Sequence, residues 1–408
     1  MPQMTRRNAL ALAAAGSVSA ACSIGESGRK RRVAVIGAGI VGASVAYHLA
    51  KAGAQVTVLE RHEIATRASR GSFAWLNATW AKQPRHYHRF NQLGLAGWQE
   101  LEREIAIPIK WGGSIEWFAD PERQTQLAQQ IEEQVEWGEP ARMLDRQELF
   151  ALEPNVAFGP AQTAALSPND GALDPVLATR ILLQHAEKLG ADIQTNCTVS
   201  GVEPSSNGVV LSTSKGEFET DTYVLATGAD PDAIQALAGI DVPQRSTPGV
   251  IVVTKPVPRQ LGRIIVGPGV HIHQRMDGRV VLGEQQGAPN TAAHAERLKG
   301  RPNRFPTSEL AEQHARRILA VAGEILPDIA DAEVEDVFIG WRPLPLDGHP
   351  AIGFSHDQPE AYVAIAHSGV SLAPIIGKLA AGEILEGSSS DLLAPYRPDR
   401  DFEVVRRY

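Results

Sequence analysis

From residue 33 onward, apolar and polar residues recur at the spacings that are typical of strands and helices. A short β-branched run at 33–36 precedes closely spaced glycines, and residues 43–52 have a helical composition that Gly53 ends. A second apolar run follows at 55–59. This succession of strand, helix and strand is typical of the start of an α/β fold with a parallel sheet.

Similar patterns continue along the rest of the chain. We expect helices at 86–105 and 121–138, and strands at 222–228, 250–254, 270–274 and 279–283, with a turn at 276–278 between the last two. Residues 111–118 have a hairpin-like pattern, with two glycines between apolar positions.

Composition supports a globular protein with more than one core. The 408 residues exceed the ~250 to 300 at which a single core stops growing, and 43% of them are hydrophobic. The net charge of −8 leaves no excess of basic residues for phosphate backbones, so no nucleic acid partner is expected. Two cysteines, Cys22 and Cys197, cannot build a disulfide framework or a multi-cysteine metal site, and no metal is predicted.

Residues 1–32 predict an export signal and a linker. Arg6 and Arg7 precede the weakly apolar, Ala-rich stretch 9–21, which resembles a twin-arginine signal and predicts a periplasmic or exported protein. The alternative is an untargeted amphipathic start. Cys22 is a candidate for lipidation, which would attach the protein to a membrane, and ordinary cleavage is the alternative.

The glycines after the first strand form a dinucleotide-binding motif, G-x-G-x-x-G. Gly37 permits the tight turn, Gly39 lets backbone N–H groups approach a pyrophosphate, and Gly42 packs the helix on the strand. Glu60 ends the second strand, where a carboxylate accepts from a ribose hydroxyl and repels the 2′-phosphate of NADP. With no second motif of this kind, the sequence predicts one dinucleotide, NAD or FAD.

Two C-terminal segments carry a family resemblance. Residues 340–353 begin Gly-Trp-Arg-Pro, and 362–374 contain His367-Ser-Gly369-Val-Ser-Leu. Together with the glycine motif, they resemble the D-amino acid oxidase superfamily of FAD-dependent oxidoreductases, which includes glycine oxidase, sarcosine oxidase and D-amino acid dehydrogenase. The resemblance spans residues 33 to 387 and implies FAD as the cofactor.

The resemblance also implies the architecture. A Rossmann-like, glutathione-reductase-like FAD-binding domain would be interleaved with an α+β substrate domain that contains an antiparallel sheet. The FAD-binding domain would comprise residues 33–80, 145–245 and 335–400. The substrate domain would comprise residues 81–144 and 246–334.

The FAD-binding residues implied by the resemblance come from four places: the glycine motif with the acid after it, the segment 67–73, the strand near 199, and the final strand-loop-helix. The helix after His367 would direct its positive end at the flavin and stabilise negative charge on the reduced ring. These candidates are Gly37, Ala38, Gly39, Ile40, Val41, Gly42, Glu60, Arg61, Ser69, Gly71, Ser72, Val199, Gly228, Gly340, Gly369, Val370, Ser371 and Leu372.

Arg342 is the candidate for substrate binding. In glycine-oxidase-like relatives, the arginine of the G-x-R-P motif binds the substrate carboxylate, and a planar guanidinium can donate two parallel hydrogen bonds to it. The alternative is an internal ion pair with Glu335 or Asp336, which precede it closely.

Two histidines are further candidates. His271 stands where such relatives tend to carry tyrosine, and its alternation with His273 puts both rings on one strand face. They would either line the substrate pocket or be satisfied polar residues on a half-exposed strand. His367 would be either an electrostatic partner of the flavin or a loop histidine bonded to backbone.

The implied reaction is oxidation of a C–N bond in an amino acid or secondary amine that carries a carboxylate. Hydride passes to flavin N5, the imine hydrolyses, and oxygen or a quinone accepts the electrons. One alternative is an FAD-dependent dehydrogenase of a hydroxy acid or polyol phosphate, which needs a strong base. Another is a flavin electron carrier without turnover.

Overall fold

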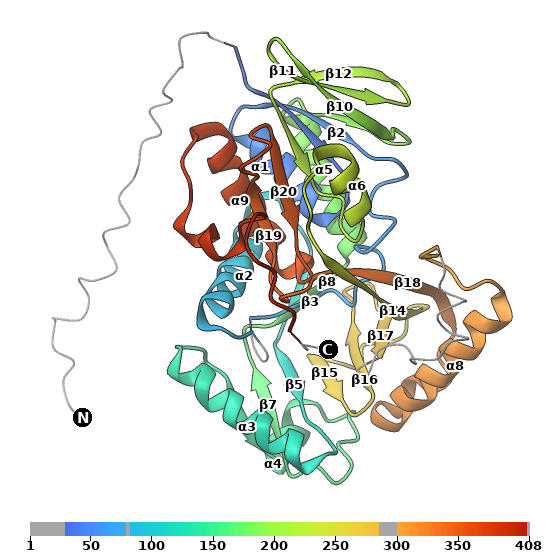
Figure 1. Cartoon of the computed structure of the whole chain (residues 1–408). Coiled ribbons are helices and arrows are strands. Elements are labelled where there is room, and N and C mark those ends of the chain that lie inside the picture. The colour runs from blue at the N-terminus through green and yellow to red at the C-terminus, as the bar shows by residue number, and fades with distance from the viewer. Residues whose placement is uncertain (1–28, 79–81, 285–299, 406–408) are drawn as a thin grey trace. The chain divides into compact units, whose positions relative to one another are not determined.

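Two large sheets organise the protein (Figure 1). The computed structural model describes residues 29–78, 82–284 and 300–405. The predicted export signal and Cys22 lie outside these residues. The described chain from Arg31 onward forms one compact unit.

The first sheet has six strands and brings together segments from both ends of the chain (Figure 1). Five of its strands are parallel, and the edge strand β19 is antiparallel to β20. Their β-branched and apolar residues are buried on both faces, as parallel strands require. In spatial order the strands are β19 (Ala351–Phe354), β20 (Ala361–Ile365), β13 (Thr222–Leu225), β1 (Arg32–Ile36), β2 (Gln55–Leu59) and β9 (Asp192–Gln194).

Helices cover one face of this sheet, and a small sheet covers the other. The helical layer and the face beneath it share a large apolar core. The helical layer consists of α1 (Ile40–Lys51), α2 (Arg85–Ile105), α5 (Pro175–Lys188) and α9 (Gly369–Glu386). The opposite layer consists of β10 (Val199–Ser205), β11 (Gly208–Thr213), β12 (Gly216–Thr220) and α6 (Pro231–Ala238).

The second sheet has eight strands, and all its pairings are antiparallel except that of β15 with β5. Its core packs on α8 (Ser308–Ile325). The strand order is β18 (Val334–Pro345), β14 (Gln244–Thr254), β17 (Val280–Glu284), β16 (Val270–Gln274), β15 (Ile264–Gly267), β5 (Ser114–Glu116), β7 (Thr163–Ser167) and β6 (Arg142–Asp145).

Shorter elements complete the described chain. A three-stranded sheet joins β3 (Trp75–Leu76), β8 (Gly171–Leu173) and β4 (Ile109–Trp111). Helices α3 (Pro121–Glu136) and α4 (Arg146–Leu152) pack beside β6 and β7. Two short 3₁₀ helices, η1 (Pro327–Ile329) and η2 (Asp391–Tyr396), follow α8 and α9.

The predicted α/β fold with a parallel sheet and an antiparallel sheet is confirmed. The division into two interleaved domains stays a prediction. Two strands of the predicted FAD-binding segments, β7 and β18, lie in the second sheet. The predicted hairpin at 111–118 is wrong, because β4 pairs with β8 whereas β5 pairs with β15 and β7. Gly112 and Gly113, with φ of 155° and 89°, direct the two strands into different sheets.

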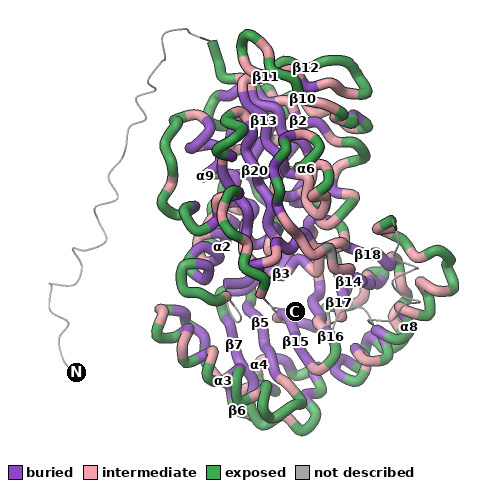
Figure 2. The backbone as a smooth tube through the Cα atoms, viewed as in Figure 1, coloured by how far each residue is buried: buried purple, intermediate pink, exposed green. Residues whose placement is uncertain are grey.

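Burial corrects a second expectation. Four of the five residues of β16 are buried, and buried residues continue through the neighbouring strands (Figure 2). The strand that carries His271 and His273 is therefore not half-exposed. Both rings lie edge-on to Phe73, with centroids 5.6 and 4.7 Å from its ring.

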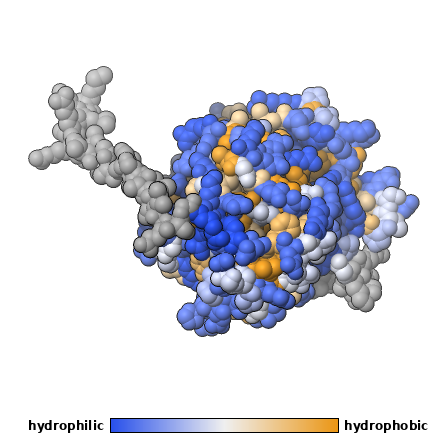
Figure 3. Space-filling model, turned by 90° about the horizontal axis from the view of Figure 1, so that it is seen from above, coloured by the Kyte–Doolittle hydropathy of each residue, from blue (hydrophilic) through white to orange (hydrophobic). Residues whose placement is uncertain are grey.

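The outer surface is mixed. The face seen from above is largely hydrophilic, with hydrophobic residues showing between the hydrophilic ones (Figure 3). Among the helices of the described chain, none is long and apolar enough to cross a membrane.

Candidate active site

A cavity of about 1240 Å³ extends from the first sheet to the second. It begins beside Gly37, Glu60, Gly228 and His367, which follow strands β1, β2, β13 and β20. The cavity therefore opens at the carboxyl ends of parallel strands, where α/β sheets bind nucleotides. Its volume exceeds the ~300 to 1000 Å³ that is usual for a drug-sized ligand.

The glycine motif closes one end of the cavity by tight backbone packing. A Cβ on Gly37 would lie 2.4 Å from the Ala226 carbonyl oxygen, and one on Gly42 would lie 2.0 Å from the Gly37 carbonyl oxygen. Gly37 also has φ of 111°, which side chains with a Cβ rarely adopt. These positions consequently require glycine for the turn and for packing of the helix on the strand.

The acid after β2 is fixed by backbone donors. Ala38 N–H donates to Glu60 Oε2 and His62 N–H donates to Oε1, both at 2.9 Å. Because each carboxylate oxygen has further lone pairs, Glu60 can still accept from hydroxyl groups in the cavity. Arg61 also lines the cavity and is ion-paired with Asp230 at 2.7 Å.

Two helices present their N-termini to this cavity. Neither α1 nor α9 carries an acidic residue in its first turn. The N-cap of α1 is Gly39, which has no side chain, and the N-cap side chain of α9, Ser368, does not bond to its helix. Ser69 Oγ accepts from Ile40 N–H at 2.9 Å, which brings the segment 67–73 against the start of α1. The positive ends of both helix dipoles thus remain available to negative charge.

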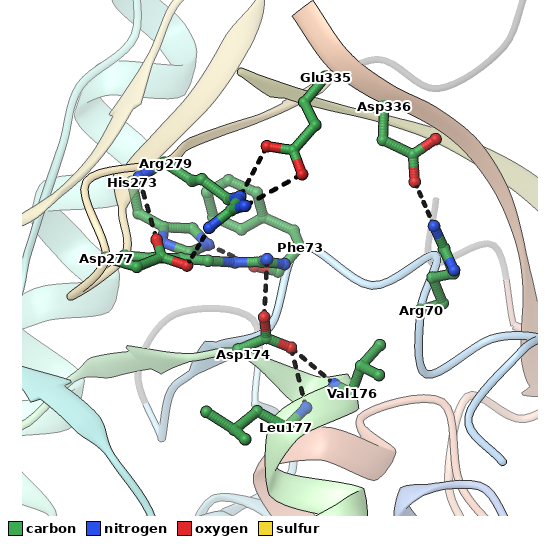
Figure 4. A network of polar contacts seen from close by, with 11 residues as sticks. Arg70, Phe73, Asp174, Val176, Leu177, His273, Asp277, Arg279, Glu335 and Asp336 are labelled. Atoms are coloured by element: carbon green, nitrogen blue, oxygen red, sulfur yellow. Dashed lines mark hydrogen bonds and ion pairs between the residues drawn. The ribbon is translucent and has the colours of Figure 1, made fainter. Parts of the chain in front are cut away.

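The segment 67–73 passes close to β18. A Cβ on Gly71 would lie 2.2 Å from Gly340 Cα, so the two backbones can cross only because both residues are glycines. Arg70 is ion-paired with Asp336 of β18 at 2.7 Å (Figure 4). Its guanidinium also lies over the Phe338 ring. These contacts attach the predicted cofactor segment to the second sheet.

Most predicted cofactor residues line this one cavity, including those from segments far apart in the sequence. Ala38, Gly42 and Leu372 do not line it; they are packed behind its wall, in keeping with their small exposed fractions or close backbone contacts. The lining set is Gly37, Gly39, Ile40, Val41, Glu60, Arg61, Ser69, Gly71, Ser72, Val199, Gly228, Gly340, Gly369, Val370 and Ser371.

Arg342 lies on the cavity wall at the second sheet. Its guanidinium covers Gly249 of β14, because a Cβ on that glycine would lie 3.0 Å from Arg342 Nη2. Glu335 and Asp336 form ion pairs with other arginines rather than the predicted alternative, a pair with Arg342. Glu335 pairs with Arg279 at 2.7 Å, and Asp336 pairs with arginines other than Arg342 (Figure 4).

Two histidines of the cavity wall are held neutral. Burial, with a smaller contribution from the nearby charge of Arg342, lowers the pKa of His271 to about 4 and that of His367 to about 3. Lys82 adds to the effect on His367. At neutral pH these imidazoles are therefore uncharged, and the histidine wall adds no positive charge beside Arg342.

The sequence did not single out several residues of the substrate half of the cavity. Glu116 and Phe118 of the β5 segment line it, as do Arg123 at the start of α3 and Lys82. Alternation along 114–118 distinguished two faces of this segment, but no local signal indicated which face meets the cavity. Only the pairing of β5 with distant strands decides this.

No metal site is apparent in the part of the chain that the structure describes, because no three histidine, cysteine or acidic side chains are grouped to hold an ion. The cavity instead offers the carboxylate of Glu60, two helix N-termini and the guanidinium of Arg342. This set fits an extended dinucleotide with a small anionic molecule beside it.

Comparisons with known proteins agree with this geometry. The family model described as FAD dependent oxidoreductase matches residues 32–383. An opine oxidase component from Agrobacterium tumefaciens is 26% identical over 380 residues, which cover 90% of this chain and 96% of that protein. Glycine oxidase from Bacillus licheniformis is 27% identical over 361 residues, covering 86% and 92%. The crystal structure of glycine oxidase from Geobacillus kaustophilus superimposes with a TM-score of 0.79 at 24% identity, covering 92% of this chain and 100% of that one.

Proposed function

Because this chain belongs to the family of FAD-dependent oxidoreductases, we propose that it oxidises the C–N bond of an amino acid or secondary amine that carries a carboxylate. Membership confirms the resemblance to the D-amino acid oxidase superfamily, FAD as the cofactor and a role as an enzyme. Glycine oxidase and opine oxidase among the relatives support an amine or amino acid as the kind of substrate.

The position of Arg342 carries the proposal. Its guanidinium lies on the cavity wall, held over Gly249 and flanked by two uncharged histidines. A carboxylate in this partly dry site would gain two charge-assisted hydrogen bonds from a fixed guanidinium plane. The substrate's carbon would then be fixed relative to the cofactor, which is the main contribution that this chain makes to rate.

The cofactor residues follow from the same cavity. Glu60 would accept from the ribose hydroxyls, the N-terminus of α1 would face the pyrophosphate, and that of α9 would face the flavin ring. Bound FAD supplies the hydride acceptor, and the imine product hydrolyses in water.

The two histidines support amine oxidation rather than alcohol oxidation. An alcohol must lose its hydroxyl proton to a strong base, whereas a neutral amine requires none. With pKa values of about 4 and 3, His271 and His367 are weak bases. This favours the amine over the alternative substrates, a hydroxy acid or a polyol phosphate.

Anaerobic reduction of the bound flavin tests the proposal. Glycine, N-methylglycine and the D- and L-amino acids should bleach the flavin absorbance, whereas the matching hydroxy acids should not. Reoxidation of the reduced enzyme by oxygen and by a soluble quinone then identifies the acceptor. Bleaching by hydroxy acids alone would refute the proposal, and bleaching by neither class would favour an electron carrier.

We further propose that the protein is exported through its twin-arginine leader. Arg6, Arg7 and the Ala-rich stretch support this, and export of a folded protein suits one that binds FAD first. Replacing both arginines by lysine should keep the flavoprotein in the cytoplasmic fraction. Cys22→Ala should release it from membranes if that cysteine is lipidated; an unchanged distribution of both variants would count against export and anchoring.

A further inference from the structure

A buried carboxyl group faces the substrate half of the cavity and is not used in the proposed reaction. Glu116, on β5, is only 4% exposed and lines the cavity together with Phe118. The residues that alternate with them, Ile115 and Trp117, belong to the apolar core behind the sheet. Strand periodicity therefore directs the Glu116 side chain into the cavity.

The Glu116 carboxyl is without a hydrogen-bond donor among residues 29–78, 82–284 and 300–405. Its electrostatic interactions there are with two charged side chains, Asp170 and Arg123. Asp170 is fully buried and accepts from Ser114 and Trp75, so it repels a second negative charge nearby. Arg123 attracts it but is exposed to solvent and stacked on Phe118, 4.1 Å from the ring centre.

Burial and Asp170 together raise the pKa of Glu116 to about 8. The carboxyl is consequently neutral near pH 7. Buried acids in a structural role are usually paired or hydrogen-bonded, as Glu139 is with Gln92 and Asn169. A carboxyl without a donor, directed into a cavity, is instead suited to a ligand that brings the missing positive charge.

The strand register places this carboxyl away from the carboxylate-binding end. Glu116 pairs with Val266 of β15, and Val266 pairs with His271 of β16, so all three side chains lie in one row on one face. Two strand spacings, about 10 Å, separate Glu116 from His271. His271 is in turn close enough to Arg342 to feel its charge.

We propose that Glu116 determines specificity by binding a basic group, an ammonium or guanidinium, at the end of the substrate remote from the carboxylate held by Arg342. This inference rests on the proposed function and narrows it to extended, basic amino acids or secondary amines. When the cation binds below pH 8, Glu116 releases its proton to solvent. The bound pair is then a carboxylate and a cation in a site shielded from water.

Arginine and citrulline, each as the D- and L-isomer, form a matched test because they have nearly the same shape and only arginine carries the charge. In the wild-type enzyme, kcat/KM for flavin reduction should favour arginine over citrulline by at least about tenfold, a modest effect for a desolvated charge pair. In Glu116→Gln this preference should disappear, while citrulline oxidation changes by less than about twofold. The control Glu139→Gln alters another buried glutamate, one that does not line the cavity, and should keep the preference.

Binding of arginine at pH 7 to enzyme whose flavin has been reduced beforehand is measured by calorimetry in buffers of different ionisation enthalpy. The wild type should release about one proton more than Glu116→Gln. Retention of the arginine preference in Glu116→Gln would overturn the inference. An equal loss for arginine and citrulline would also overturn it, because Glu116 would then act in the oxidation itself.

If wild-type enzyme oxidises neutral amino acids but not basic ones, only this inference fails. If no amine reduces the flavin, the proposed function fails. An unchanged flavin spectrum and a cooperative thermal transition verify that the variant is folded.

Discussion

Replacing Arg342 by alanine removes the group on which the proposed substrate binding depends. The guanidinium lies over the Gly249 backbone on the cavity wall, and its charge helps to keep two neighbouring histidines neutral. Alanine at this position leaves the strand β18 intact, because backbone pairing with β14 does not involve the side chain. The variant should therefore fold and bind FAD.

The expected loss follows from the hydrogen bonds that the guanidinium can form. A hydrogen bond to a charged group contributes about 1.5 to 3 kcal/mol net, and about 1.4 kcal/mol corresponds to tenfold in affinity. Loss of one bond to the carboxylate raises the dissociation constant at least about tenfold, and loss of both raises it about a hundredfold or more. Arg342→Lys, which keeps the charge but not the planar pair of donors, should fall between wild type and alanine.

Stopped-flow flavin reduction under anaerobic conditions separates binding from chemistry. The concentration dependence of the observed rate gives the substrate dissociation constant, and its limit gives the rate of reduction. Arg279→Ala is the matched control, because this arginine also belongs to the second sheet but pairs with Asp277 and Glu335 outside the cavity (Figure 4). It should leave both constants unchanged.

Two outcomes would contradict the reasoning. A substrate dissociation constant unchanged in Arg342→Ala would show that this arginine does not bind the carboxylate. A loss of equal size for an amine without a carboxylate would show that the effect is structural. The pKa values of His271 and His367 supply a second readout, since removal of the nearby positive charge should raise both.

Three further predictions concern cofactor binding and stability. Ser69→Ala removes the acceptor for the first N–H of α1 and should cost about 1 to 3 kcal/mol, lowering the apoprotein melting temperature; an unchanged value would refute this. Gly71→Ala places a methyl group 2.2 Å from Gly340 Cα and should weaken FAD binding, measured by fluorescence titration, at least about tenfold. Gly382→Ala, with open space around its Cβ, should bind FAD normally in the same titration. Between pH 4.5 and about 8, Glu116 keeps its proton in the folded protein and loses it in the unfolded chain, so the free energy of unfolding falls as pH rises through this range. Urea unfolding at saturating FAD should show a smaller fall for Glu116→Gln than for wild type, and equal falls would disprove the raised pKa.

The dinucleotide end of the cavity was predictable because its determinants are local. The turn at Gly37, the start of α1 and the acid after β2 lie within about thirty residues, and each acts through backbone geometry or a nearby donor. Helix starts were similarly readable, since Asp120 accepts from the N–H groups of the two residues after Pro121. The family resemblance added Arg342.

The substrate end was not predictable in this way. Glu116 belongs to a three-residue strand whose role depends on pairing with β15, which comes after about 150 further residues. The same short segment was expected to form a hairpin, and the positive φ angles of Gly112 and Gly113 instead send it into another sheet. Strand register is set by which distant partner buries its apolar face, and periodicity within one strand does not identify that partner.

The sequence by itself determined the cofactor-binding motif, the α/β class and the family, because short-range backbone geometry and motif order suffice for these. Only the tertiary structure decided that Glu335 and Asp336 pair with other arginines, that His271 and His367 lie partly buried beside Arg342, and that Glu116 faces the same cavity. Each of these depends on which charges and apolar surfaces meet across distant strands. Such contacts fix burial and electric field, and through them the protonation states on which substrate recognition depends.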